Sequence, residues 1–164
     1  MLDVKPAPES DKEALWQLFQ EYAEELSTYD GEKRKKGCYH YPCFDLYWKD
    51  PKKIPLIVLY DHQPIGFCLL QDIDLCYRVD EFFIRPIYRR RGFGKLAVEK
   101  AKEICELLGR HEVLAANVYV NNEPALEFWK SVGFTDTGRR TRVKKLRLVE
   151  MECDIYNQLK KQKT

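Results

Sequence analysis

The sequence predicts one domain of the mixed α/β class. Strand-like apolar runs alternate with amphipathic helical segments, in the order strand, helix, irregular segment, three strands, helix, strand, helix and two strands. A chain of 164 residues is long enough to build one stable core. No linker, repeat or low-complexity tract interrupts residues 1–164, so we expect a single domain over that range.

The first third of the chain predicts a strand, a helix and an irregular segment. Residues 2–8 have the pattern of a short strand that ends at prolines. Residues 10–30 carry apolar side chains at helical spacing, and Ser10 with Glu13 matches a capping box. Residues 31–53 are basic and aromatic without a regular period. We therefore expect a helix with one apolar stripe, followed by a long irregular segment.

Three strands and a helical crossover occupy the middle of the chain. Apolar runs at 54–61, 65–75 and 76–85 are separated by turn signals. Residues 92–108 return to helical spacing, and a strand-like run at 112–120 follows. Because a helix connects them, we expect the strands at 76–85 and 112–120 to be parallel.

A short helix and a hairpin follow the crossover. The helix begins after Asn122, a suitable N-cap, with Pro124 in its first turn, and it ends at Gly133. Residues 134–155 have the pattern of two strands joined by a basic tip. We interpret the basic residues of 139–147 as a solvated hairpin with one wet face.

Composition excludes several classes of protein. The hydrophobic fraction of 45% and the charged fraction of 33% are typical of globular proteins. No apolar run approaches the roughly 18–20 residues that span a membrane, and the N-terminus lacks a secretion signal. We therefore expect a cytoplasmic protein without a membrane partner. A net charge of +2 argues against a dedicated nucleic-acid-binding protein, although residues 33–36 form a basic run.

The six cysteines do not suggest a metal site. They form no CxxC pair, and their spacing matches no zinc pattern. A catalytic cysteine would need a polarising partner, and no neighbour in the sequence serves as one. We expect reduced, mostly buried thiols and no bound metal.

Residues 84–101 predict an anion site. Three arginines precede Gly92, and Gly94 opens a predicted helix. A helix N-terminus offers free backbone amides and the positive end of its dipole. Glycines let the backbone approach a ligand closely, and arginine suits phosphate oxygens. A pyrophosphate group is the expected guest, because glycines and a helix start beside the arginines disfavour a merely solvated charge run.

Two common phosphate motifs fit this stretch poorly. A Walker A loop would need a glycine where Arg89 stands and Ser or Thr where Leu96 stands. The run "GFGKLA" fits the dinucleotide fingerprint, but the next strand ends in Asn121 instead of an acidic residue. The run Arg89–Gly94 instead resembles the [RQ]-x-x-G-x-[GA] signature of the GNAT superfamily, the acyl-CoA-dependent N-acyltransferases.

A second motif supports this resemblance. Asn122, Ala125, Trp129, Gly133 and Phe134 have the spacing of the family's next conserved segment. The order of strands and helices agrees over nearly the whole chain. The resemblance implies a central mixed sheet of six or seven strands, mostly antiparallel with one splayed parallel pair, flanked by about four helices.

The resemblance also implies acetyl-CoA as co-substrate. Its pyrophosphate would lie on the loop and helix start formed by Arg89, Arg90, Arg91, Gly92, Phe93, Gly94 and Lys95. The pantetheine arm would lie along the strand that ends with Phe82, Phe83 and Ile84. Asn122 would approach the arm from the other side.

Direct transfer needs a base, since an alkyl amine with a pKa of about 10.4 is mostly protonated at neutral pH. Asp80 and Glu81 are the candidates, and alternation along a strand would let only one of them face the cleft. We favour Glu81, whose side chain is longer; an acidic pair without a role is the alternative. Backbone amides near Ile84 would meet the developing negative charge.

Trp129 stands where the family usually has its general acid, a tyrosine. Indole donates a hydrogen bond but does not release its proton near neutral pH. Trp129 therefore either steadies the sulfur, serves only in packing, or leaves the role to Tyr119 or Tyr88.

The acceptor pocket is expected near Tyr39, His40 and Tyr41, in the segment that usually walls it in this family. An aromatic wall suits a cation, whereas the basic run at 33–36 repels polycations.

The resulting prediction is an N-acetyltransferase for a small-molecule primary amine. Alternatives are a protein acetyltransferase, acting on lysine or an N-terminus, and a CoA-binding regulatory module without turnover. The resemblance also implies that the C-terminal strands can pair with those of a second copy, which would form a homodimer.

Overall fold

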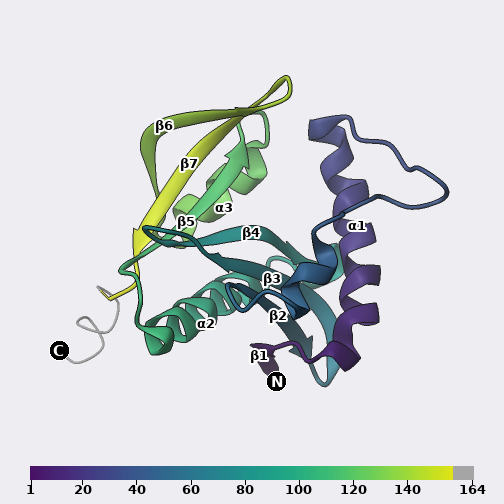
Figure 1. Ribbon diagram of the computed structural model, residues 1–164, viewed down its shortest axis with the longest axis horizontal. Coiled ribbons are helices and arrows are strands. Elements are labelled where there is room, and N and C mark those ends of the chain that lie inside the picture. Colours follow the sequence, from purple (N-terminus) through teal and green to yellow (C-terminus); the bar gives the residue numbers. More distant parts are fainter. Residues whose placement is uncertain (157–164) are drawn as a thin grey trace.

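The computed structural model describes residues 1–156, which form a seven-stranded sheet with helices on both faces (Figure 1). The strand order is β1-β2-β3-β4-β5-β7-β6. The strands are β1 (Leu2–Pro6), β2 (Lys53–Tyr60), β3 (Gln63–Asp72), β4 (Tyr77–Ile84), β5 (Val113–Tyr119), β6 (Thr135–Val143) and β7 (Leu146–Asp154). The α-helices are α1 (Lys12–Asp30), α2 (Phe93–Leu108) and α3 (Glu123–Ser131). The predicted mixed fold and its order of elements are confirmed.

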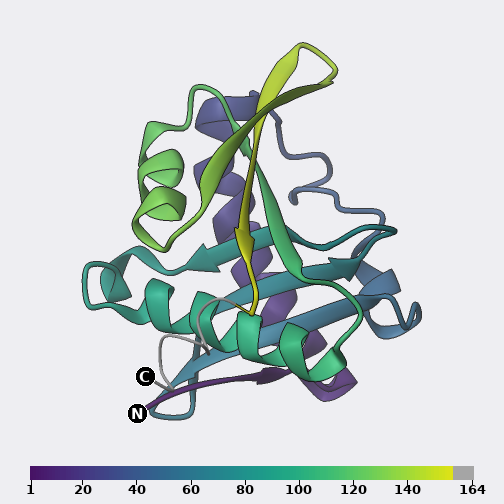
Figure 2. The same cartoon turned by 90° about the vertical axis from the view of Figure 1, so that its left-hand side faces the viewer.

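The sheet separates two apolar cores. Figure 2 shows α2 in front of the sheet and α1 behind it. On the α1 side, Leu15, Leu18 and Phe19 pack on Phe67 and Phe83. The opposite core contains the buried faces of α2 and α3 and runs the length of the sheet. The described residues contain three α-helices rather than about four, because much of the irregular segment folds only as a short 3-10 helix, Phe44–Trp48.

The start of α1 differs from the predicted capping box. Ser10 lies in a preceding 3-10 turn, Glu9–Asp11, and no side chain caps the helix. The end of the helix follows the usual rule, since Gly31 adopts a left-handed φ of 70° and its N–H donates to the Ser27 carbonyl. The stripe itself is as expected and buries α1 against the sheet.

Strands β4 and β5 are parallel for only three residues and then separate. Their pairing runs from Tyr77 opposite Leu114 to Val79 opposite Ala116. Beyond this point β4 pairs only with β3, and β5 only with β7. Alternate N–H and C=O groups of β4 therefore face an open slot in the middle of the sheet.

A β-bulge lies in β4 where the slot begins. Leu69 pairs with Glu81, but Leu70 pairs with Val79, which leaves Asp80 as the extra residue. The bulge breaks the alternation expected for a regular strand. Asp80 and Glu81 consequently both contact the α1 side of the sheet, through Tyr47 and Tyr22 respectively. The expectation that the two carboxylates point to opposite faces is therefore wrong.

The tip of the β6–β7 hairpin lies near the C-terminal end of α1 (Figure 1). At its tip, Lys144 lies 3.1 Å from Glu32. Next to it, the Asn121 side chain donates to the Tyr29 carbonyl at 3.4 Å. These contacts join the hairpin and the loop after β5 to the C-terminal end of α1 and the residues that follow it. None of the helices in residues 1–156 has an apolar stretch long enough to cross a lipid bilayer.

Candidate active site

One cavity of about 1220 Å³ passes through the slot between β4 and β5. On the α2 and α3 side it is lined by Arg90, Gly94, Asn122, Phe128 and Trp129, among others. On the α1 side it is lined by Tyr22, Tyr41, Lys53, Gln71, Arg78, Asp80, Glu81 and Tyr119, among others. The cavity therefore joins the predicted anion loop to the predicted carboxylates.

The loop before α2 has the geometry of an anion site. Arg90 and Gly92 both adopt left-handed backbone conformations, with φ of 62° and 80°. Gly92 is the N-cap and has no capping side chain. The Leu96 N–H is the first in the helix to find an internal acceptor, the Gly92 carbonyl. The amides of residues 93–95 are thus left for a ligand.

The three arginines of this loop have three different environments. Arg89 donates to both carboxylate oxygens of Glu25 on α1, at 2.9 and 2.6 Å, and to the Ile84 carbonyl at 2.7 Å. Arg91 stacks over the rings of Tyr60 and Phe93, away from the cavity. Within residues 1–156 only Arg90 of the three lines the cavity without an ion-pair partner.

Neighbouring positions separate into backbone and side-chain roles. A Cβ on Gly94 would lie 2.9 Å from Cε2 of Phe128, so glycine lets α2 approach α3. Asn122 caps α3 as predicted, its Oδ1 accepting from the Ala125 N–H at 3.2 Å, and it also lines the cavity. Lys95 is exposed and does not line the cavity, whereas Phe82 and Ile84 do.

Glu81 has the environment of a general base. Its carboxylate accepts a hydrogen bond from the Tyr22 hydroxyl, in the cavity. Burial raises the pKa of Glu81 to about 7, and the Tyr22 hydrogen bond opposes part of that rise. A base with a pKa near the working pH is well matched to accept a proton from an amine.

Asp80 is held by ionic and hydrogen-bonding partners. Its carboxylate accepts from Tyr47 at 2.5 Å and from Nε of Arg78 at 2.8 Å. Nζ of Lys53 lies 3.8 Å from it. These contacts make Asp80 a less available proton acceptor than Glu81.

Trp129 lies in an aromatic cluster at the cavity wall. It is 6% exposed and contacts the rings of Phe82, Phe128 and Phe134. Of the tyrosines considered as its substitute, Tyr119 lines the cavity, whereas Tyr88 packs on Tyr60 outside it. Burial raises the pKa of Tyr119 to about 12, which makes it a weak proton donor.

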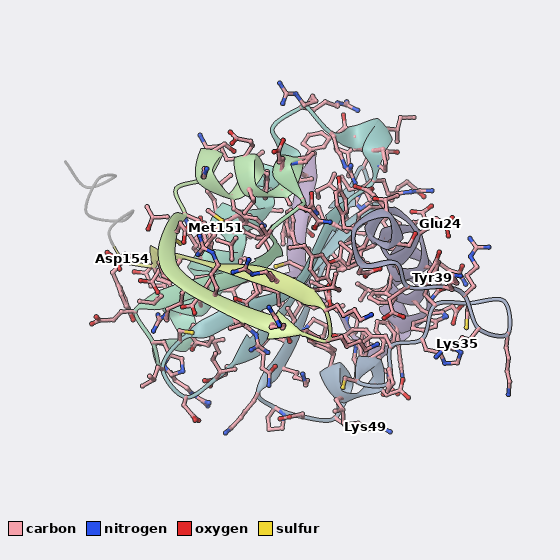
Figure 3. The ribbon with its side chains drawn as sticks, turned by 90° about the horizontal axis from the view of Figure 1, so that it is seen from above. Glu24, Lys35, Tyr39, Lys49, Met151 and Asp154 are labelled. Carbon is pink, nitrogen blue, oxygen red and sulfur yellow. The ribbon has the colours of Figure 1, made fainter. Side chains whose placement is uncertain are left out.

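The predicted acceptor wall is only partly in place. Tyr41 lines the cavity, with Cys43 beside it. Figure 3 shows Tyr39 next to Glu24 on α1, to which its hydroxyl donates at 2.6 Å. His40 is exposed, 3.1 Å from the Lys35 carbonyl, and does not line the cavity.

The cysteines are free throughout the described residues. Cys68 and Cys105 are buried as expected, but Cys43 is exposed at the cavity. Residues 1–156 contain no group of three His, Cys, Asp or Glu side chains placed to hold a metal ion.

Sequence reasoning missed the partners of the carboxylates. Tyr22 belongs by its spacing to the apolar stripe of α1. Its hydroxyl, which donates to Glu81, was the only sign in the sequence that it does more than pack. Lys53, Gln71 and Arg78 lie on three different strands, and only the strand register reveals that they meet. No local motif contains all three.

Two bacterial proteins share part of this sequence. The peptidyl-lysine N-acetyltransferase YjaB of Escherichia coli K12 is 40% identical over 77 residues, which cover 47% of this chain and 46% of the relative. The protein of that name from Salmonella typhimurium LT2 is 36% identical over 77 residues, covering the same shares. The matched region thus spans less than half the length of each relative.

Solved structures share the fold at low sequence identity. Spermidine N-acetyltransferase from Vibrio cholerae, solved with CoA and spermine, has a TM-score of 0.73 and 18% identity over 96% of this chain and 98% of that one. The ribosomal-protein-S18-alanine N-acetyltransferase of Escherichia coli has a TM-score of 0.71 and 15% identity over 94% of both chains.

The family assignment rests on the sequence as well as the fold. The sequence profile of the acetyltransferase (GNAT) family matches residues 13–134. That range contains all of α1 except its first residue, the slot, the anion loop and α3. The chain therefore belongs to the acetyltransferase (GNAT) family.

Proposed function

We propose that this protein transfers the acetyl group of acetyl-CoA to a primary amine of a small molecule. The observation that carries the proposal is the cavity, which connects free amides at the start of α2 with the carboxylate of Glu81. A diphosphate suits the first end, and an amine suits the second.

The residues at the first end fit acetyl-CoA. Arg90 and the amides of residues 93–95 would hold the pyrophosphate. The N–H of Arg85 donates to β3, so alternation turns the N–H groups of Phe82 and Ile84 toward the slot, where they would bind the pantetheine arm or a developing negative charge. When bound, acetyl-CoA supplies an activated acetyl thioester.

Proton transfer at the second end is assigned to Glu81. With a pKa of about 7, it takes the proton of the incoming ammonium directly or through one water. Trp129 and Tyr119 are poor acids at neutral pH, so we assign no general acid. A thiol has a pKa of about 8.5, so the sulfur leaves as a thiolate.

A small acceptor is favoured by the side chains around the cavity. Tyr41 and Cys43 line the end proposed for the acceptor, and the Lys144–Glu32 ion pair joins the hairpin to the segment that follows α1. A protein acceptor is the second candidate, because the partial match is to a peptidyl-lysine N-acetyltransferase. A CoA-binding module without turnover is the third, favoured by Trp129 in the usual position of a tyrosine acid.

Calorimetry with acetyl-CoA, followed by thiol release across a panel of amines, tests this proposal. We expect binding that Gly92→Glu abolishes, because the new carboxylate would oppose the pyrophosphate. Gly109→Glu is the matched control: its φ of 72° imposes similar backbone strain at the other end of α2.

The outcomes separate the three candidates. Release accelerated by small amines supports the proposal, whereas release only with a lysine peptide identifies a protein acetyltransferase. Acetyl-CoA binding that no amine turns over identifies the binding module. Equal affinity in the wild type and Gly92→Glu would overturn the placement of the pyrophosphate.

A further inference from the structure

The inner end of the cavity, on the α1 side, contains a row of polar side chains that the chemistry above does not use. Lys53, Gln71 and Arg78 lie directly opposite one another on β2, β3 and β4. The Gln71 amide oxygen accepts from Nζ of Lys53 and from Nη2 of Arg78, each at 3.2 Å. All three line the cavity.

This row carries more positive charge than its partners neutralise. Lys53 and Arg78 share one carboxylate, that of Asp80, and Gln71 is neutral. The side chains of Lys53 and Asp80 are only 11% and 10% exposed, so solvent screens them weakly. These three side chains and Asp80 together leave one unit of positive charge, and Glu81, which also faces this end, adds a negative charge when it is ionised.

Arg78 retains free donors. Its Nε is used by Asp80 and its Nη2 contacts Gln71, but within residues 1–156 its Nη1 has no hydrogen-bond partner. The side chain is 35% exposed and lines the cavity. A guanidinium with open donors in a cavity suits a planar anion such as a carboxylate.

The anion site and the base lie on the same strand and the same side of the sheet. Arg78 and Glu81 are separated by Asp80 and its bulge, which is why both face the α1 side. A ligand with an ammonium near Glu81 and a carboxylate near Arg78 would therefore match the charge pattern at both points. A single unpaired positive charge also fits a carboxylate better than a doubly charged phosphate.

We propose that Arg78, supported by Lys53 and Gln71, binds a carboxylate of the acceptor, so that the substrates are short amino acids with a primary amine and a carboxylate. This inference rests on the proposed function, whose acceptor class it specifies. Polyamines are poor acceptors, because a second cation would meet the Lys53–Arg78 pair.

Matched pairs of acceptors test the inference: glycine, β-alanine and γ-aminobutyrate, each against its carboxamide, with spermidine added. We expect at least one carboxylate to be preferred over its carboxamide in kcat/KM. In Arg78→Gln that preference falls by about tenfold or more, mainly through KM. The measured quantity is the ratio of kcat/KM for a carboxylate to that for its carboxamide. Dividing this ratio in the variant by the same ratio in the wild type cancels the intrinsic reactivity of each amine.

Arg110→Gln is the matched control. It also removes an arginine from an ion pair, with Asp72, but at a position that does not line the cavity. The preference should be unchanged in this variant. Equal use of carboxylates and carboxamides by the wild type, or a preference that survives Arg78→Gln, would overturn the inference and leave the proposed function standing.

A binding experiment separates this inference from turnover. N-acetyl-β-alanine and its carboxamide are titrated calorimetrically into the protein saturated with CoA. Binding of the carboxylate that weakens about tenfold in Arg78→Gln supports the anion site, even if no amine is acetylated and the proposed function fails. The absence of any difference between the two ligands counts against the site.

Discussion

Glu81 combines two opposing influences on one carboxyl group. Burial in the cavity disfavours its charged form, while the Tyr22 hydroxyl stabilises that form by a hydrogen bond. The balance leaves a pKa of about 7, at which the group both accepts and returns protons near neutral pH.

The pH dependence of kcat should therefore report Glu81. We expect activity to fall as pH drops below about 7, because the protonated carboxyl cannot act as a base. Tyr22→Phe should move this acid limb to higher pH, since it removes the hydrogen bond that lowers the pKa. Glu81→Gln should abolish the limb and reduce kcat by about 10²–10⁴.

The control for this experiment is Tyr39→Phe. It removes another hydrogen bond from a tyrosine to a glutamate, Glu24, but away from the cavity. A limb that stays in place in Tyr22→Phe, or that persists in Glu81→Gln, would show that another group titrates.

At the scale of single residues, the sequence did not predict the surroundings of each side chain in the proposed anion site. The loop before α2 was expected to bind an anion through its arginines, and within residues 1–156 Arg89 and Arg90 line the cavity, Arg89 with an ion pair to Glu25 and Arg90 without one. Arg89 and Arg91 are held by Glu25 and by aromatic rings. Those partners lie far away in the sequence, so no local pattern reveals them.

At the scale of elements, the contact between α2 and α3 depends on one missing side chain. Gly94→Ala would place a methyl group 2.9 Å from the Phe128 ring, which must then move. We expect a loss of about 1–3 kcal/mol in the free energy of unfolding. The midpoint of thermal unfolding should fall by roughly 2–4 °C for each kcal/mol.

Calorimetry of the double variant Gly94→Ala/Phe128→Leu checks the cause. A smaller side chain at position 128 gives the methyl group room, so the double variant should lose less stability than the sum of the single variants. Additive losses would show that the Phe128 contact is not responsible.

Helices and strands were predictable where periodicity or capping acts locally. Asn122 caps α3 and Gly109 ends α2, as their positions in the sequence indicate. Ser10 does not cap α1, because a 3-10 turn precedes the helix. The bulge at Asp80 could not be predicted, since the residues after it are apolar on both faces of β4.

At the scale of the whole molecule, the two ends of the cavity lie on different sides of the sheet. Donor and acceptor would reach the slot independently, and both must be present for transfer. We expect initial-rate plots that intersect, and no radiolabel on the protein after incubation with labelled acetyl-CoA alone. Cys43 is the one cysteine of residues 1–156 that lines the cavity, so Cys43→Ser tests whether a thiol carries the acetyl group.

Parallel initial-rate lines, with label retained by the wild type and lost in Cys43→Ser, would contradict direct transfer.

The overall topology itself followed from the sequence, because a strand–helix–strand crossover fixes the one parallel pair. The cavity end proposed for the acceptor could not be predicted in this way, because it is assembled from β2, β3, β4 and the segment before β2.

The extra residue in β4 also affects how this protein should be compared with others. Deleting Asp80 would restore regular alternation in β4, with Glu81 directly after Val79 and still on the α1 side, opposite Leu69. In a homologue without that insertion, a carboxylate on the α1 side therefore stands one position closer in sequence to the residue equivalent to Val79. An alignment of this strand that introduces no gap would pair a base with a side chain from the wrong surface.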